Sequence, residues 1–238
     1  MFVVDTNVLV YAADRDAPGH ERCLGLLMAW RARPEPDLGA APAVTRFVVV
    51  DVESTGLDLR SDRLIAIGAV TVDATRVDLG RAFYAILRQP ESSSRENILV
   101  HGIGGTQQRE GEDPVEALLA FLEFAGKAPL VGYHAAFDDG MIRRAAGEHL
   151  GLSFARPWID LAYLAPDLMP EEARKCKHLD AWLELFGIEV FSRHDAIADA
   201  LATAQLLLAV LARAALPPKR VASMLWDPGA TRWLGDRR

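Results

Sequence analysis

Apolar and polar positions alternate along the chain in a way that predicts strands first and helices later. The apolar run Phe47 to Val50 lacks the polar alternation of a half-exposed strand, which indicates a strand buried on both faces. Two further strands are expected over residues 64–72 and 80–87, separated by a polar hinge over residues 73–78. With the first strand they predict an antiparallel meander.

The second half of the chain shows mostly helical spacing. Asp113 followed by Pro114 predicts a helix start, because aspartate caps a helix and proline fits its first position. Other helices are expected over residues 138–150, 161–168 and 179–186, and short strands over 130–134 and 158–160. A last helix from about residue 195 is expected to bury one face, made of Ile197, Ala200, Leu201, Ala204, Leu208 and Leu211. Together these elements predict an α/β fold of three layers with a mixed five-stranded central sheet flanked by helices.

Composition narrows the class of protein. The chain has 238 residues, half of them hydrophobic, which is enough for one sizeable core. Its net charge of −7 argues against a protein that coats nucleic acid through charge alone, but not against an enzyme that holds phosphates through metal ions. Two distant cysteines, Cys23 and Cys176, and the lack of a signal-peptide pattern favour a cytoplasmic protein. The apolar run 197–211 contains Asp199, so a buried helix is expected and no membrane span.

The chain divides into four parts by pattern. Residues 1–33 form a strand-helix stub, residues 34–45 a Pro/Ala linker, residues 46–216 the main domain, and residues 217–238 a polar tail. The stub opens with an apolar run ending at Asp5, followed by a helix start. This segment resembles the opening of PIN-domain ribonucleases, in which Asp5 would match the first metal-binding aspartate. Nothing after it continues that pattern, so we expect a structural role.

The main domain begins with a pair of acids. Asp51 and Glu53 are two residues apart at the end of the buried strand, so both side chains point to the same face. Like charges repel at a buried position, and a divalent cation with oxygen ligands relieves the repulsion. Gly56 then ends the strand in a tight turn. The pair by itself is a weak indication of a metal site.

Two later motifs strengthen that indication. Asp138 follows a buried strand and lies in the first turn of a helix, and His194 precedes Asp199 by five residues. On one helix those last two side chains would point about 140° apart. They can share a site only if His194 lies in the loop before the helix and Asp199 one turn inside it. A loop position would leave the imidazole mobile, as suits a general base.

The motifs Asp-x-Glu-x-Thr-Gly, Phe-Asp and His-x-Ala-x-x-Asp, in this order, resemble those of the DEDDh exonucleases. This family includes the proofreading subunit of the bacterial replicative polymerase (DNA polymerase III epsilon) and ribonuclease T. The resemblance covers roughly residues 45–215. It implies a ribonuclease H-like fold, two Mg²⁺ or Mn²⁺ ions, and release of nucleoside 5′-monophosphates from 3′ ends. It also assigns residues: Asp51, Glu53, Asp138 and Asp199 as metal ligands, with His194 as the general base.

The resemblance also suggests substrate contacts. Thr55, Gly56 and Leu57 would hold the terminal nucleotide, with Leu57 as a wedge beneath the last base. Phe137 is a candidate for base stacking, although a core position is the more common place for such an aromatic. His101 is a candidate contact or a residue that organises its loop. His134 replaces an asparagine found in many members, so an aromatic or hydrogen-bonding variation, rather than a ligand, is expected there.

The expected function is 3′-5′ cleavage of single-stranded nucleic acid, with DNA favoured. Trimming of RNA 3′ ends or an oligoribonuclease-type activity is the nearest alternative. A binding module with a vestigial site and a PIN-type endonuclease centred on Asp5 are rivals from other classes. A homodimer and a polymerase partner are left open, because no interface pattern is visible in the sequence.

Overall fold

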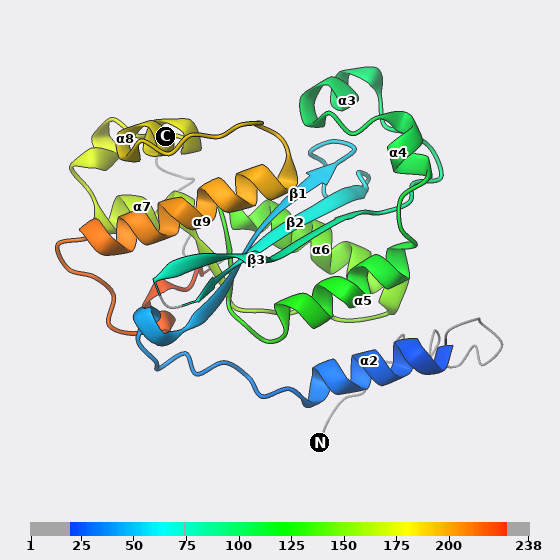
Figure 1. Cartoon of the computed structure of the whole chain (residues 1–238), viewed down its shortest axis with the longest axis horizontal. Helices are drawn as coiled ribbons and strands as arrows, with labels where there is room; N and C mark the ends of the chain where they lie inside the picture. Colours follow the sequence, from blue (N-terminus) through cyan, green and yellow to red (C-terminus); the bar gives the residue numbers. More distant parts are fainter. Residues whose placement is uncertain (1–19, 74, 228–238) are drawn as a thin grey trace.

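The computed structural model of the chain describes residues 20–73 and 75–227. Its centre is a sheet of five strands in the order β3-β2-β1-β4-β5 (Figure 1). The strands are β1 (Arg46–Ser54), β2 (Leu64–Asp73), β3 (Arg76–Ile86), β4 (Leu130–Gly132) and β5 (Trp158–Asp160). The pairs β1–β2 and β2–β3 are antiparallel, whereas β1–β4 and β4–β5 are parallel. The predicted meander and the mixed five-stranded sheet are therefore confirmed.

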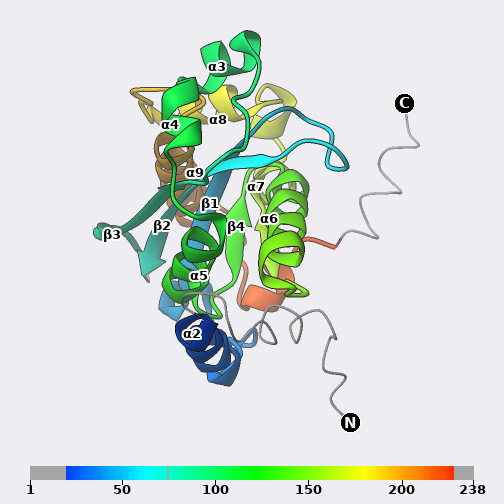
Figure 2. The ribbon, with the colours of Figure 1, turned by 90° about the vertical axis from the view of Figure 1, so that its right-hand side faces the viewer.

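Helices cover both faces of the sheet. They are α2 (His20–Ala32), α3 (Arg95–His101), α4 (Gly105–Arg109), α5 (Pro114–Ala125), α6 (Ala135–Leu150), α7 (Leu161–Leu168), α8 (Leu179–Phe186) and α9 (Ala196–Arg213). Three short 3₁₀ turns, η1 (Pro42–Val44), η2 (Glu172–Arg174) and η3 (Val221–Met224), lie between or after them. One core lies between the sheet and α5 and α6, and the other between the sheet and α7, α8 and α9 (Figure 2).

The alternation of β1 between these two cores decides where its acids point. Val48 and Val50 belong to the core on the α5–α6 side, whereas Phe47 and Val49 belong to the core on the α9 side. Since side chains alternate along a strand, Asp51 and Glu53 lie on the same side of the sheet as Phe47 and Val49. The spacing of the two acids thus directs both toward α9.

The prediction of a polar hinge over residues 73–78 is wrong. Asp73 pairs with Arg76, and β3 starts there. A register shift between Val70 and Thr71 takes up the extra residues, so the ladder continues through a polar stretch. Polar residues are tolerated because β3 is an edge strand with one exposed side.

Helices α3 and α4 were not predicted from the sequence. The Ser94 side chain caps α3 by accepting from the Asn97 backbone N–H, and Gly102, with a φ of 72°, ends the helix. A left-handed residue after the last turn is a common helix stop, and glycine adopts it without steric cost.

The buried face of α9 agrees with the expected one only at Ala200 and Ala204. It is made of Ala196, Asp199, Ala200, Ala202, Thr203, Ala204, Leu206, Leu207 and Val210. Ile197, Leu201, Leu208 and Leu211 are only half-buried. The helix is therefore turned about its axis relative to the expectation, so that Leu206, Leu207 and Val210 are the large residues it buries. By length and composition α9 alone among the described helices could cross a membrane, yet half of it is buried in this domain, as in a core helix.

Segments at both ends pack on the domain. In α2, Leu27 and Trp30 are buried against α5, and the Trp30 indole donates to the Gly126 carbonyl at 2.7 Å. Near the other end, Val221 and Met224 are buried in the core on the α9 side. Residues 1–19, including the PIN-like run and Asp5, lie outside the described residues. The division into a stub, a linker, a domain and a tail remains a prediction.

Candidate active site

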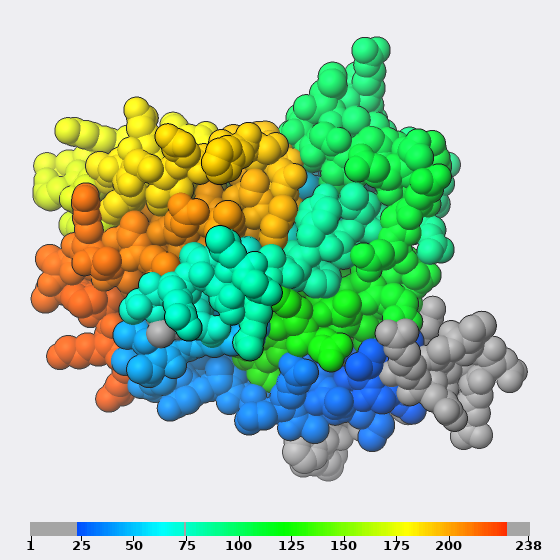
Figure 3. Space-filling model, in the orientation of Figure 1, coloured from blue at the N-terminus to red at the C-terminus, as the bar shows by residue number. Residues whose placement is uncertain are grey.

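A cleft of about 580 Å³ opens at the C-terminal end of β1. Its walls come from α3, from the N-terminal ends of α6, α8 and α9, and from the turn after β1. Figure 3 shows a hollow between α3 and the segment that runs from α8 into α9. The lining residues are Asp51, Val52, Glu53, Ser54, Gly56, Leu57, Asn97, Val100, Tyr133, His134, Phe137, His178, Leu179, Asp180, Arg193, His194 and Asp199.

The two acids of β1 lie half-buried in this cleft. Burial, followed by repulsion from Asp138 and Asp199, raises the pKa of Asp51 well above its usual range. Burial and the charges of Asp199 and Asp195 raise the pKa of Glu53 to about 8. Two carboxylates with raised pKa values at one end of a strand fit a cation-binding role, because a cation would stabilise their ionised forms.

Asp138 lies beside this pair, in the first turn of α6, and is only 4% exposed. Burial and the charge of Asp160 raise its pKa, although a hydrogen bond with the Val52 backbone counteracts the effect. A Cβ atom on Gly132 would lie 3.1 Å from Asp138 Oδ2, so a glycine on β4 makes room for the carboxylate.

Neighbouring acids have structural roles. Asp139 is buried and accepts from the Trp158 indole at 2.9 Å and from Arg143 at 2.5 Å. Asp160 and Asp195 cap α7 and α9 through hydrogen bonds to backbone N–H groups.

Asp199 completes the acidic group from the first turn of α9, where it is 5% exposed. Its Oδ2 accepts from the His194 backbone N–H at 2.9 Å, and its Oδ1 accepts from Arg193. His194 is exposed and lies in the loop before α9, with a φ of 58°. This is the placement that the helical angle between the two positions required.

The residues fit a divalent cation in chemistry, although their side chains are not arranged as a finished ligand set. Within residues 20–73 and 75–227, no three His, Cys, Asp or Glu side chains form such a set. One reason is visible, since Arg193 occupies an oxygen of Asp199. Carboxylate oxygens are nevertheless the donors that Mg²⁺ and Mn²⁺ prefer, and four carboxylate side chains surround the end of β1.

Three of the expected substrate residues line the cleft. Gly56 and Leu57 lie at its edge, and Leu57 is 86% exposed. Phe137 lines the cleft as well, but it is half-buried and packs against the core on the α5–α6 side. It therefore combines the two roles that the sequence left as alternatives: a core position and a face toward the cleft.

Two others do not line the cleft. The Thr55 hydroxyl donates to Asp62 Oδ1 at 2.8 Å and accepts from the Arg63 backbone N–H at 2.9 Å, so it organises the turn. His101 is buried: its Nδ1 accepts from the Ile103 N–H, and its Nε2 lies 2.9 Å from Asn97 Oδ1. Of the two roles considered for His101, these contacts favour organising the loop.

Sequence reasoning missed several residues that line the cleft. Asn97 and Val100 were missed because α3 was not predicted. Asp180 comes from α8, whose approach to the acids is a tertiary contact. Arg193 could have been noticed from its position next to His194.

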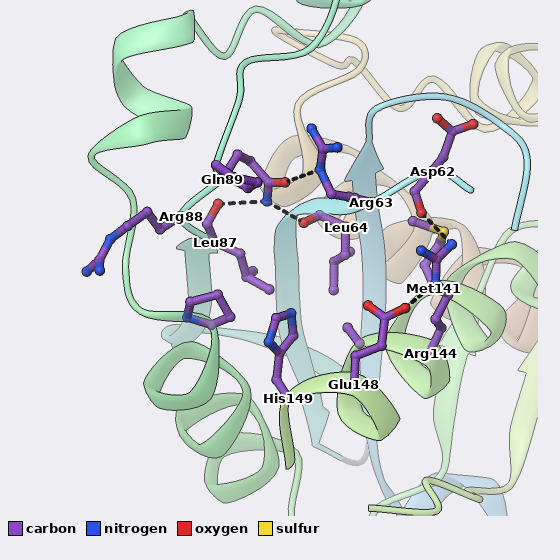
Figure 4. A pocket seen from close by; sticks show the side chains of 13 residues that line it. Asp62, Arg63, Leu64, Leu87, Arg88, Gln89, Met141, Arg144, Glu148 and His149 are labelled. Atoms are coloured by element: carbon purple, nitrogen blue, oxygen red, sulfur yellow. Dashed lines mark hydrogen bonds and ion pairs between the residues drawn. The ribbon is translucent and has the colours of Figure 1, made fainter. Parts of the chain in front are cut away.

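A second cavity of about 180 Å³ lies on the other side of the turn after β1 and contains none of the four acids (Figure 4). Leu64, Leu87 and Met141 are among its apolar lining residues. At its edge Arg144 donates to the carbonyls of Leu59 and Asp62, which fixes the turn that carries Leu57.

Comparisons with known proteins identify the family of the chain. A family model described as RNase_T, exonuclease, matches residues 48–207. Among curated proteins, the PolC-type DNA polymerase III of Thermotoga petrophila is 33% identical over 163 residues, and that of Bacillus subtilis 34% over 170 residues. These matches cover 68% and 71% of this chain but only 12% of each relative, so the chain spans a small part of their length.

Solved structures agree in fold. Escherichia coli exonuclease I in complex with a dT13 oligonucleotide has a TM-score of 0.60 and 22% identity, covering 71% of this chain and 41% of that one. Exonuclease X in complex with 5′ overhanging duplex DNA has a TM-score of 0.59 and 17% identity, covering 75% of this chain and 98% of that one. The chain therefore belongs to the exonuclease family, with a ribonuclease H-like fold.

Proposed function

We propose that this protein removes nucleotides one at a time from the 3′ end of single-stranded nucleic acid, with DNA favoured, using two Mg²⁺ or Mn²⁺ ions. The observation that supports this most is the gathering of four carboxylates around the end of β1, with His194 at the rim of the same cleft. Among the relatives, exonuclease I is described in complex with a DNA oligonucleotide.

The four acids would hold the ions. Asp51 lies at the centre of the group, where it interacts with the other three carboxylates, and is suited to contact both ions. Glu53 and Asp199 would complete one site, and Asp138 the other. When bound, divalent ions stabilise charge on the attacking and leaving oxygens of a displacement at phosphorus.

His194 would act as the general base. Histidine exchanges a proton near neutral pH, and an exposed loop position lets the ring approach a water molecule in the cleft. As the water oxygen bonds to phosphorus, one of its protons passes to the imidazole. The bond from phosphorus to the 3′ oxygen breaks, and that oxygen takes up a proton from solvent. The products are a nucleoside 5′-monophosphate and a strand shortened by one residue, with a free 3′ hydroxyl.

Leu57, Val100 and Phe137 provide apolar surface in the cleft, on which the last bases of the substrate could stack. Gly56 would let the backbone approach the terminal nucleotide closely. No residue among those that line the cleft is assigned to distinguish ribose from deoxyribose. Trimming of RNA 3′ ends is therefore the alternative to be tested.

A gel time course tests the proposal. Single-stranded DNA and RNA of one sequence, labelled at the 5′ end, are incubated with Mg²⁺, Mn²⁺ or chelator. We expect a metal-dependent ladder that shortens from the 3′ end, faster on DNA, and lost in Asp51→Ala. His194→Ala should lose most of the rate, roughly 10²- to 10⁴-fold, while still binding Mn²⁺ in a calorimetric titration. Wild-type protein that gives no ladder and binds no Mn²⁺ would favour a vestigial binding module, and internal cuts would favour the PIN-type alternative.

A further inference from the structure

Arg193 bridges two walls of the cleft. Its Nε donates to Asp180 Oδ1 at 2.8 Å, in the first turn of α8, and its Nη1 donates to Asp199 Oδ1, in the first turn of α9. The arginine side chain is 33% exposed, whereas the Asp199 side chain is only 7% exposed. The guanidinium group therefore lies between a buried acid and the open cleft.

Acidic side chains outnumber basic ones in the cleft around Arg193. Among the described residues that line the cleft, Arg193 is the only arginine or lysine, while Asp51, Glu53, Asp180 and Asp199 are acids. Buried carboxylates close to one another are unfavourable unless a cation compensates them. Arg193 is thus the one permanent positive charge that the cleft lining itself provides.

Its position conflicts with metal binding by Asp199. Both oxygens of that carboxylate are engaged, Oδ1 by Arg193 and Oδ2 by the His194 N–H at 2.9 Å. A guanidinium group and a divalent cation repel each other, so they cannot share Oδ1 without cost. We propose that Arg193 is a resident counter-ion that competes with metal for Asp199, and that on release it binds a phosphate of the substrate. This inference rests on the metal-dependent function proposed above.

Asp180 explains why the released arginine would stay in place. It is 65% exposed and bonded to Nε, which leaves the outer nitrogens able to face the cleft. A guanidinium group matches the geometry of phosphate oxygens and can bind them through two parallel hydrogen bonds. Because Arg193 adjoins His194, its movement would also reposition the proposed base when metal binds.

A stability experiment separates this role from a merely structural one. In chelator, Arg193→Gln should lower the Tm by about 5–10 °C, because Asp199 loses the cation beside it. In saturating Mn²⁺ that difference should shrink by about 2–5 °C, because metal then compensates the acids and stabilises the variant more than wild type. Arg193→Lys, which keeps the charge, should lose less in chelator. An equal Tm deficit with and without Mn²⁺ would overturn the proposal.

Arg143→Gln is the matched control. Arg143 pairs with Asp139 at 2.5 Å on α6, and neither residue lines the cleft. Its removal is the same chemical change, and its effect on the Tm should be independent of Mn²⁺. A control that is rescued by Mn²⁺ as fully as Arg193→Gln would show that the rescue is nonspecific and would also overturn the proposal.

Calorimetric titration with Mn²⁺ measures the competition directly. Arg193→Gln should bind the metal more tightly than wild type, roughly threefold to tenfold, because a repelling charge is gone. Metal binding by both proteins with equal or weaker affinity in the variant would overturn this assignment and leave the proposed function intact. No binding by wild type would overturn both.

Steady-state kinetics tests the phosphate contact. At saturating Mn²⁺, Arg193→Gln should raise KM for a single-stranded oligonucleotide roughly tenfold and change kcat less. An unchanged KM would overturn the transfer of Arg193 to substrate.

Discussion

The carboxyl group of Glu53 shows how far the surroundings change a single side chain. Its pKa is raised from 4.5 to about 8, first by burial and then by the charges of Asp199 and Asp195. In metal-free protein at neutral pH, a substantial part of this group holds a proton. A divalent cation must displace that proton, so metal uptake should release protons and strengthen as pH rises.

The same shift predicts how stability depends on pH without metal. The folded protein holds the Glu53 proton up to about pH 8, whereas the unfolded chain loses it near pH 4.5. The folded state therefore binds more protons in this window, and the free energy of unfolding falls as pH rises, by on the order of 2–4 kcal/mol. Denaturant unfolding of wild type and Glu53→Gln in chelator, between about pH 5 and 8, measures this pH dependence of the free energy of unfolding. Equal pH slopes in the two proteins would contradict the assignment.

Leu57 provides a second test at this scale. It is 86% exposed and lines the cleft, so truncation should affect substrate rather than folding. We expect Leu57→Ala to lower kcat/KM on single strands roughly 5- to 20-fold, through lost contact with the terminal base, and to leave the Tm unchanged. Leu216→Ala is the control, because Leu216 is also 86% exposed but does not line the cleft. Equal kinetic effects would remove the role of Leu57.

Among the elements, the contact between β2 and α9 positions the site. Gly68 pairs with Asp51 in the ladder, and a Cβ atom built on Gly68 would lie 2.3 Å from the Ala196 backbone. Only a residue without a side chain allows the first turn of α9 to lie this close to the sheet. That closeness brings Asp199 to Asp51.

Gly68→Ala should therefore affect stability and metal binding together. The clash is with backbone, which cannot move aside as a flexible side chain would, so we expect a loss of about 2–4 kcal/mol in the free energy of unfolding. Mn²⁺ affinity should fall as well, because α9 carries Asp199. Gly147→Ala is the control: Gly147 lies inside α6 with nothing within 4 Å of a built Cβ, and that variant should be neutral or more stable. Denaturant unfolding and calorimetric titration measure both, and normal Mn²⁺ affinity in Gly68→Ala would contradict the argument.

For the whole molecule, the question is whether α2 belongs to the exonuclease domain. Trp30 is 7% exposed, its indole donates to Gly126, and the Lys127 ammonium lies 3.4 Å from the centre of its ring. These contacts join α2 to the region of α5. In Figure 1, α2 lies at the bottom of the molecule, whereas α3, which lines the cleft, lies at the top. The helix should support the fold without taking part in the chemistry.

Trp30→Ala should thus lower stability and spare activity. Removing a buried tryptophan costs about 3–5 kcal/mol, which corresponds to a Tm decrease of roughly 6–20 °C in a domain of this size. Activity at a temperature where the variant is folded should remain within about twofold of wild type, since the cleft is not touched. Met28→Ala is the control, because Met28 lies on the same helix but is 62% exposed. A selective loss of activity in folded Trp30→Ala would show that α2 reaches the site.

Much of this protein follows from sequence because the signals are local. The buried run of β1 and the cap and proline that start α5 each act within a few residues, and both elements were expected. The two-residue spacing of Asp51 and Glu53 determines a common face on any strand. The order of three acidic motifs indicated the family, and the helical angle placed His194 in a loop.

Other features depended on contacts between distant segments. The buried face of α9 is set by its approach to Gly68, and the length of β3 by pairing with β2 through a register shift. His101 turned from candidate contact to buried organiser of α3 because both of its ring nitrogens find partners inside the fold. The bridge from Arg193 to Asp180 and Asp199 joins two helices and has no local pattern. Sequence thus determined which groups could do chemistry, whereas packing decided which of them meet, because long-range contact depends on the whole arrangement of the chain.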